Sequence, residues 1–173
     1  YEVVDYELMP NDICLKVAEI VAEFPKVTLS WYDEYKWHAQ SVDENVIFHR
    51  EYVGIQEKLS TLTMETRVLK LMLISFDESS FQGVLNKLQA QNFPGITLTR
   101  SGPNYAEIVS ESVSKGIAVE KIVKDKGLDL SEVAAFGDGH NDISMLEKVG
   151  LPIVMGNAEE EVKQYGQLIA ESS

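Results

Sequence analysis

The chain has 173 residues with 45% hydrophobic and 25% charged, which is the mixture of one ordinary globular domain or two small ones. Its formal net charge of −13 disfavours nucleic acid or an anionic membrane as a partner, because those surfaces are bound through an excess of Lys and Arg. The single cysteine, Cys14, excludes an internal disulfide, and the apolar runs are far shorter than a membrane span, so we expect a cytoplasmic protein.

The first hundred residues mix helical and extended patterns. Apolar residues at helical spacing follow Pro10 and predict a helix that ends at Pro25. A second helix is expected to start at a cap formed by Ser79 or Ser80. Strands are expected at 26–31, 67–76, 96–100 and 105–109, with a strand and a short helix within 32–53. This mixture is typical of an α+β unit.

From Ser114 onward, helical and extended patterns alternate strictly. A helix stopped by Gly127 precedes strands at 133–136, 151–155 and 168–170, with helices at 143–149 and 159–165 between them. Such alternation predicts right-handed crossovers and a parallel sheet. We place a boundary within 101–111 and expect an α/β fold with an α+β domain over 1–105 and a partial parallel Rossmann-like core over 106–173.

An acidic, glycine-rich loop follows the strand at 133–136. Asp138 is the first polar side chain after this strand and lies between Gly137 and Gly139. Open parallel sheets place ligands at the carboxyl ends of strands, and Mg²⁺ prefers one or two carboxylates with water and a substrate phosphate. We therefore expect Asp138 to be a magnesium ligand, with a helix N-cap as the alternative role.

The same loop continues into the next helix through His140, Asn141 and Asp142. Unpaired N–H groups and the helix dipole favour anions there, so Asn141 is expected to donate to a phosphate. Asp142 is a second candidate metal ligand, and bracing of the loop or helix capping is equally open. His140 is not expected to bind the metal, because magnesium sites are oxygen sites.

Lys115 stands at another junction between a strand and a helix, flanked by Ser114 and Gly116. A lysine in this position can extend its ammonium as a point charge toward a phosphoryl group, and the alternative is an exposed lysine without a role. We expect the strand before it to neighbour the strand before Asp138 in one sheet. Lys115 and Asp138 would then converge above neighbouring strand ends.

Three motifs together resemble a known family: Ser114–Gly116, Gly137–Asp142 with Met145–Glu147, and Val154–Ala158 with Glu161–Lys163. Their order and spacing resemble the carboxyl-terminal half of a Cof-type phosphatase of the haloacid dehalogenase-like superfamily, which is far more specific than one glycine-rich loop. Residues before about 101 resemble, more loosely, the α+β cap of these enzymes.

The resemblance implies Mg²⁺-dependent hydrolysis of a phosphomonoester, such as a sugar phosphate or a similar small phosphorylated metabolite. It implies that Lys115 is catalytic and contacts the nucleophile and the phosphoryl oxygens, and that Asn141 contacts the phosphate. Asp138 would bind Mg²⁺, and Asp142 would be the second acidic residue of the metal loop.

One element of the family pattern is missing from the sequence. Members begin with a strand that ends in Asp-x-Asp-Gly-Thr, whose first Asp is the nucleophile and whose second is the general acid and base. No Asp-x-Asp occurs in the 173 residues. The nearest imitations are Asp5 with Glu7, and Asp77, which fits a strand exit and helix cap better. We therefore expect a fragment, a truncated product or one part of an assembly that is inactive alone, and its incomplete sheet would favour a homo-oligomer.

Two other classes of function are open. A non-catalytic binding or regulatory protein derived from such a phosphatase could use the aromatic residues Trp31, Tyr32, Tyr35 and Trp37 as a contact surface. A receiver-like phospho-acceptor would also place acidic residues at strand ends, but such domains contain no inserted α+β unit.

Overall fold

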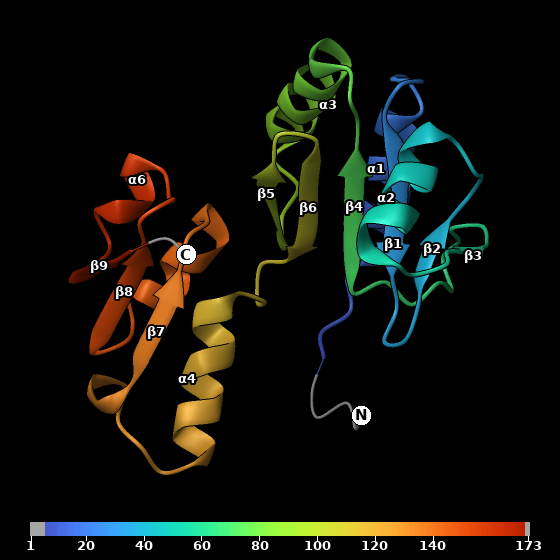
Figure 1. Cartoon of the computed structure of the whole chain (residues 1–173). Helices are drawn as coiled ribbons and strands as arrows, with labels where there is room; N and C mark the ends of the chain where they lie inside the picture. The colour runs from blue at the N-terminus through green and yellow to red at the C-terminus, as the bar shows by residue number, and fades with distance from the viewer. Residues whose placement is uncertain (1–5, 172–173) are drawn as a thin grey trace. The chain divides into compact units, whose positions relative to one another are not determined.

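The computed structural model describes residues 6–171, and the chain divides into two compact units (Figure 1). The first unit ends at Glu111 and the second begins at Ser112. Within the described residues, each unit has its own sheet, of six strands in the first and three in the second. The mixed α/β fold class that the sequence predicts is confirmed.

The first unit is built around a largely antiparallel sheet with strand order β3-β2-β1-β4-β6-β5, in which only β2 and β3 are parallel. Its elements are α1 (Asn11–Val21), β1 (Thr28–Tyr32), β2 (Trp37–Ala39), α2 (Glu44–Val53), β3 (Lys58–Leu59), β4 (Lys70–Ile74), α3 (Glu78–Gln91), β5 (Ile96–Gly102) and β6 (Tyr105–Ser110). These elements match the α+β mixture expected for this part of the chain.

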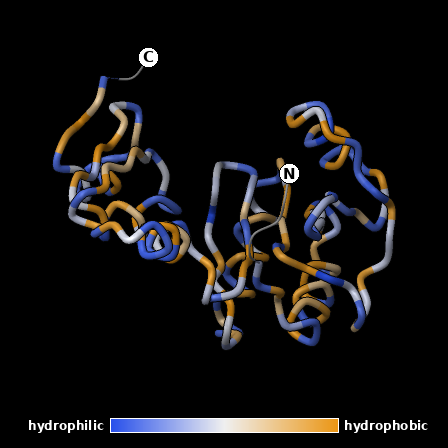
Figure 2. Tube along the Cα trace, turned by 90° about the horizontal axis from the view of Figure 1, so that it is seen from below, coloured by the Kyte–Doolittle hydropathy of each residue, from blue (hydrophilic) through white to orange (hydrophobic). Residues whose placement is uncertain are grey.

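Alternate residues of the central strand β4 belong to two different cores. Leu71 and Leu73 pack with apolar residues of α1 and α3, among them Val17 and Phe81. Met72 belongs to a smaller cluster on the other side, where α2 contributes Val46. The helices carry both hydrophilic and hydrophobic residues (Figure 2), as expected for elements that bury one side. Both faces of this sheet are therefore covered, at least in part.

The aromatic contact surface suggested by the sequence is not present as such. Trp31 and Trp37 are 0% and 1% exposed, because each lies on a strand and points into a core. Of the four aromatic residues, Tyr35 is the strongly exposed one, at 80%. The two tryptophans are therefore not available to such a surface, since their large apolar rings are buried between sheet and helices.

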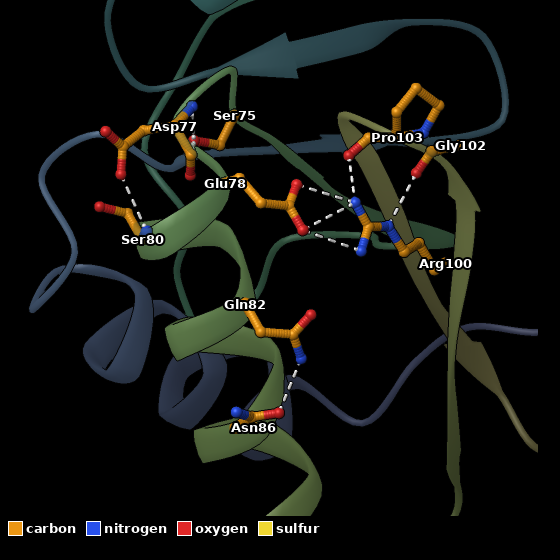
Figure 3. Close-up of polar contacts among 9 residues, drawn as sticks. All are labelled: Ser75, Asp77, Glu78, Ser80, Gln82, Asn86, Arg100, Gly102 and Pro103. Atoms are coloured by element: carbon orange, nitrogen blue, oxygen red, sulfur yellow. Dashed lines mark hydrogen bonds and ion pairs between the residues drawn. The ribbon is translucent and has the colours of Figure 1, made fainter.

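Helix α3 begins at Glu78, two or three residues earlier than a cap at Ser79 or Ser80 would place it, because Asp77 is its N-cap. The Asp77 side chain accepts a hydrogen bond from the Ser80 backbone N–H at 2.9 Å (Figure 3), and Lys26 donates to its other oxygen at 2.6 Å. The Lys26 ammonium and the Ser80 N–H hold the pKa of Asp77 below its usual range. The strand exit and helix cap expected at Asp77 are confirmed, whereas Asp5 lies outside the described residues.

The second unit alternates strands and helices around a fully parallel sheet with order β7-β8-β9. Its elements are α4 (Lys115–Asp125), η1 (Leu130–Glu132), β7 (Ala134–Gly137), η2 (His140–Asp142), α5 (Ile143–Leu146), β8 (Leu151–Met155), α6 (Glu160–Lys163) and β9 (Leu168–Ala170), where η denotes a 3₁₀ turn. A small core forms from Leu146, Val154, Ala158 and Val162. The predicted parallel sheet is confirmed.

Strand β6 belongs to the sheet of the first unit, whereas the sequence suggested that it belongs to the parallel sheet of the second. β6 pairs with β4 and β5, so the boundary expected between residues 105 and 106 falls within that strand, whereas the compact units divide between Glu111 and Ser112. The expectation that the strand before Lys115 neighbours β7 is therefore wrong. The reason is the short turn at 103–104 between β5 and β6, because two strands joined by a tight turn pair with each other in antiparallel fashion.

One face of the second sheet is apolar and uncovered within the described residues. Phe136, Ile153 and Leu168 stand in register across the three strands, and Phe136 and Leu168 are 61% and 52% exposed. Parallel sheets are ordinarily covered on both faces.

Among the described residues, no helix has the length and apolar character needed to cross a lipid bilayer.

Candidate metal and phosphate site

The acidic loop after β7 is folded around the carboxylate of Asp142. This residue is 4% exposed, and its Oδ2 accepts hydrogen bonds from the backbone N–H groups of Asp138 and Gly139, both at 3.0 Å. A Cβ on Gly137 would lie 2.6 Å from the Cβ of Asp142, which is closer than real side chains approach. Glycine at position 137 therefore allows the carboxylate to reach back to the strand end and shape the loop.

Lys115 reaches this carboxylate from a different element. It is the first residue of α4, whose N-cap Ser114 accepts from the Ile117 backbone N–H at 3.1 Å. Its Nζ donates to Oδ1 of Asp142, and half of its side chain is exposed. The convergence of Lys115 and the acidic loop thus arises from the packing of α4 on α5 and not from two neighbouring strands.

Gly116 makes that packing possible. A Cβ at this position would lie 2.1 Å from the backbone oxygen of Ser144, and the Gly116 N–H donates to Ser144 Oγ at 3.2 Å. The start of α4 therefore lies directly against α5. Since Lys115 precedes Gly116, this close backbone approach places its ammonium within reach of Asp142.

The environment of Asp142 keeps it ionised. Burial raises the pKa of Asp142, but the hydrogen bonds from Lys115 and from the N–H groups of Gly139 and Asp138 outweigh burial and leave the pKa below its ordinary value. Both carboxylate oxygens accept hydrogen bonds. This arrangement favours the bracing role, which the sequence left open beside direct metal ligation.

Asp138 is the carboxylate that the loop presents outward. Its side chain is exposed, and its Oδ2 accepts from Asn157 Nδ2 at 3.3 Å. Within residues 6–171, no group of three or more His, Cys, Asp or Glu side chains is arranged to hold a metal ion. One outward carboxylate nevertheless fits Mg²⁺, which takes few protein ligands and completes its shell with water and phosphate.

The other two loop residues differ in their contacts. His140 Nε2 lies 3.3 Å from Oε2 of Glu161, a residue of α6, so this ring nitrogen contacts a side chain of another element. Asn141 is exposed, and its side-chain oxygen lies over Gly139, where an added Cβ would be 2.8 Å away. An amide in this position can donate to an anion beside Asp138.

The contact of Asn157 with Asp138 was missed as a functional feature of the sequence. Asn157 belongs to the motif Val154–Ala158, but nothing in that motif alone assigns it a role. A signal was available, since Asn157 follows β8 as Asp138 follows β7, and the two strands are parallel neighbours. Polar residues just after adjacent parallel strands lie at the same edge of the sheet.

Comparison with known proteins decides the family. A model of the haloacid dehalogenase-like hydrolases matches residues 1–173. The chain belongs to this family. A Haemophilus influenzae relative is 32% identical over 164 residues, which are 94% of this chain and 62% of that protein. The Bacillus subtilis phosphatase YwpJ is 39% identical over 74 residues, or 43% of this chain and 26% of that protein.

Solved structures share the fold of this family member. A haloacid dehalogenase-like hydrolase from Bacteroides thetaiotaomicron has a TM-score of 0.82 at 24% identity, with 98% of this chain and 65% of that chain covered. The subclass IIB sugar phosphatase BT4131 has a TM-score of 0.79 at 22% identity, with 98% and 64% covered. The chain therefore spans less than two thirds of the length of these similar proteins.

Proposed function

We propose that this haloacid dehalogenase-like chain provides the metal and phosphate contacts of a Mg²⁺-dependent phosphomonoesterase for a small phosphorylated metabolite, such as a sugar phosphate. The observation that carries the proposal is the joint engagement of Asp142 by Lys115 and by the loop that presents Asp138. The family membership and the phosphatases among the similar proteins support it.

Each group has a distinct task in this proposal. Mg²⁺, when bound at Asp138, would neutralise charge on the phosphoryl oxygens. The Lys115 ammonium has three N–H groups, of which Asp142 needs one, so the others can donate to the phosphoryl oxygens and to the attacking carboxylate. The Asn141 amide, on the same loop as Asp138, would donate to the phosphate. Asp142 holds Lys115 and the loop in place.

The family's nucleophile is the first Asp of an Asp-x-Asp motif, and the 173 residues contain no such motif. We expect the chain alone to show no Mg²⁺-dependent hydrolysis of p-nitrophenyl phosphate. A chimaera in which a relative's segment with Asp-x-Asp-Gly-Thr precedes Tyr1 is expected to gain it.

Matched variants of the chimaera test the named residues. Lys115→Ala and Asp138→Asn are each expected to lower kcat at least about 100-fold, the usual effect of removing one electrostatic contact to a developing charge. Lys124→Ala and Asp125→Asn are the controls, since both residues are exposed and lie at the other end of α4. They should leave kcat unchanged.

Two outcomes would contradict the proposal. Robust turnover by the 173-residue chain itself would show that it holds its own nucleophile. A chimaera that binds sugar phosphates with Mg²⁺ but does not hydrolyse them would support the alternative, a binding or regulatory protein derived from a phosphatase.

A further inference from the structure

Asn157 occupies a fixed position beside the outward carboxylate of the loop. It lies two residues after the end of β8, which extends one residue beyond the end of β7, because Gly137 pairs with Val154. The following residue, Ala158, is buried, and its N–H donates to the Met155 carbonyl at 3.0 Å. The turn that carries Asn157 is therefore anchored to the small core of the second unit.

The side-chain amide of Asn157 contacts one oxygen of Asp138 only. Its Nδ2 lies 3.3 Å from Oδ2, and the structure of residues 6–171 gives Oδ1 of Asp138 no hydrogen-bond partner. A carboxylate at the tip of a loop can rotate about two side-chain torsions. A single donor on Oδ2 restricts that rotation and leaves Oδ1 available to a cation.

We propose that Asn157 is a positioning residue that holds the Asp138 carboxylate for a divalent cation. This inference rests on the proposed function, because it takes Asp138 as the metal ligand. The chemistry of an amide suits the task, since it donates a hydrogen bond without carrying charge. A lysine here would neutralise the carboxylate and compete with the cation, and an acidic residue could not donate when ionised.

The contribution of Asn157 is separable from that of Asp142. Asp142 binds the backbone N–H groups of Asp138 and Gly139 and so fixes the path of the loop. Asn157 contacts the side chain of Asp138. Removing Asn157 should therefore leave the loop folded and change only how well the carboxylate is oriented. Partners of metal ligands typically change metal affinity about 10-fold to 100-fold, and we expect about 3-fold to 10-fold for this exposed contact.

The test measures cation binding to the complete 173-residue chain by NMR. Broadening of backbone amide signals by Mn²⁺ locates the cation, and a Mg²⁺ titration of the Asp138 and Gly139 amide shifts gives the dissociation constant. Asn157→Ala should raise this constant about 3-fold to 10-fold while the metal-free loop spectrum is retained. Asn157→Gln, which keeps the amide, should recover part of the affinity. Gln167→Ala is the control, because Gln167 is exposed in the same unit.

The outcomes separate this inference from the proposed function. If the unmodified chain shows no Mn²⁺ broadening at Asp138, the metal site itself is wrong and the inference falls with it. If the unmodified chain binds and Asn157→Ala binds equally well, only the role of Asn157 is wrong. If Asn157→Ala loses affinity together with the metal-free loop spectrum, Asn157 holds the fold and does not position the carboxylate.

Discussion

The two units of the chain differ in the size of their buried cores. The first covers its sheet from both sides and buries Trp31, Leu73 and Phe81 completely. The second has a core of four buried residues and leaves Phe136 and Ile169 61% and 53% exposed. All candidate site residues lie in the second unit. The geometry of the site therefore depends on close backbone contacts and on hydrogen bonds to Asp142 more than on a large apolar core.

The two units also differ in what surrounds their glycine residues. In the second unit, a Cβ on Gly116 would lie 2.1 Å from the Ser144 backbone oxygen, and one on Gly150 equally close to the Ser131 oxygen. In the first unit, a Cβ on Gly83 would meet the ring of Phe24 at 2.8 Å. A ring can rotate away, whereas a backbone oxygen within a packed helix cannot. Substitution of glycine should therefore harm the second unit much more.

The largest effect is expected from Gly116→Ala. The clash with Ser144 has to separate α4 from α5, and overpacking of this kind costs about 3 kcal/mol or more. We expect the amide signals of the second unit to collapse in an NMR spectrum while those of the first unit persist. Gly83→Ala should change the free energy of unfolding of the first unit by less than about 1 kcal/mol. Equal damage by both substitutions would remove the contrast between the units.

A second pair of variants compares the two cores directly. Leu73→Ala in the first unit and Leu146→Ala in the second each remove a side chain that is no more than 1% exposed, and each should cost about 2 to 5 kcal/mol. Because the second core is small, the same loss should abolish its cooperative thermal unfolding but only lower the Tm of the first unit. Calorimetry of both variants checks this, and a cooperative second unit in Leu146→Ala would contradict it.

Acid should affect the two units in different pH ranges. In the first unit, burial and the nearby Lys70 lower the pKa of His49, which lies between the hydroxyls of Tyr32 and Tyr105. The unfolded chain then binds a proton more readily than the folded one, so stability is lost as the pH falls below about 6.5. In the second unit the pKa of Asp142 is lowered, and its contribution is lost only as the pH falls below about 4.

Two substitutions isolate these contributions. His49→Gln should remove the part of the pH dependence of first-unit unfolding that begins as the pH falls below about 6.5, the ordinary histidine pKa. Asp142→Asn should flatten the acid limb of the second unit below about pH 4. Urea unfolding followed by NMR at several pH values gives both curves. An unchanged curve in either variant would show that the titrating group lies elsewhere.

Much of the second unit could be predicted from local patterns. The strands expected at 151–155 and 168–170 coincide with β8 and β9, because apolar runs of this length are long enough for a strand but too short for a helix. The position of Asp138 after β7 followed from the same alternation. In α4 the neighbouring apolar residues Ile122 and Val123 differ, because Val123 is buried and Ile122 is 55% exposed. Periodicity indicates which residues share a face but not whether anything covers it.

The remaining features depend on tertiary contacts that no local pattern contains. β6 joins the first sheet because of its pairing with β4 and β5. The engagement of both Asp142 oxygens requires α4, which begins 27 residues earlier, to pack on the loop. The contact of Asn157 with Asp138 spans two parallel strands in the same way. Sequence motifs identified these residues, and the fold determines which of them touch.

The smallest effect on folding is expected at the uncovered face of the second sheet. Phe136 lies on the edge strand β7 and is 61% exposed, so Phe136→Ser should change the free energy of unfolding by less than about 0.5 kcal/mol. It should nevertheless reduce self-association of the chain, because exposed apolar faces and open strand edges promote contacts between molecules. Sedimentation over a range of concentrations measures the self-association. Tyr35→Ser is the control, since Tyr35 is also an aromatic residue and is 80% exposed in the first unit. A loss of stability well above 1 kcal/mol would mean that Phe136 is covered in the protein, and the two units would then be packed more alike than their cores suggest.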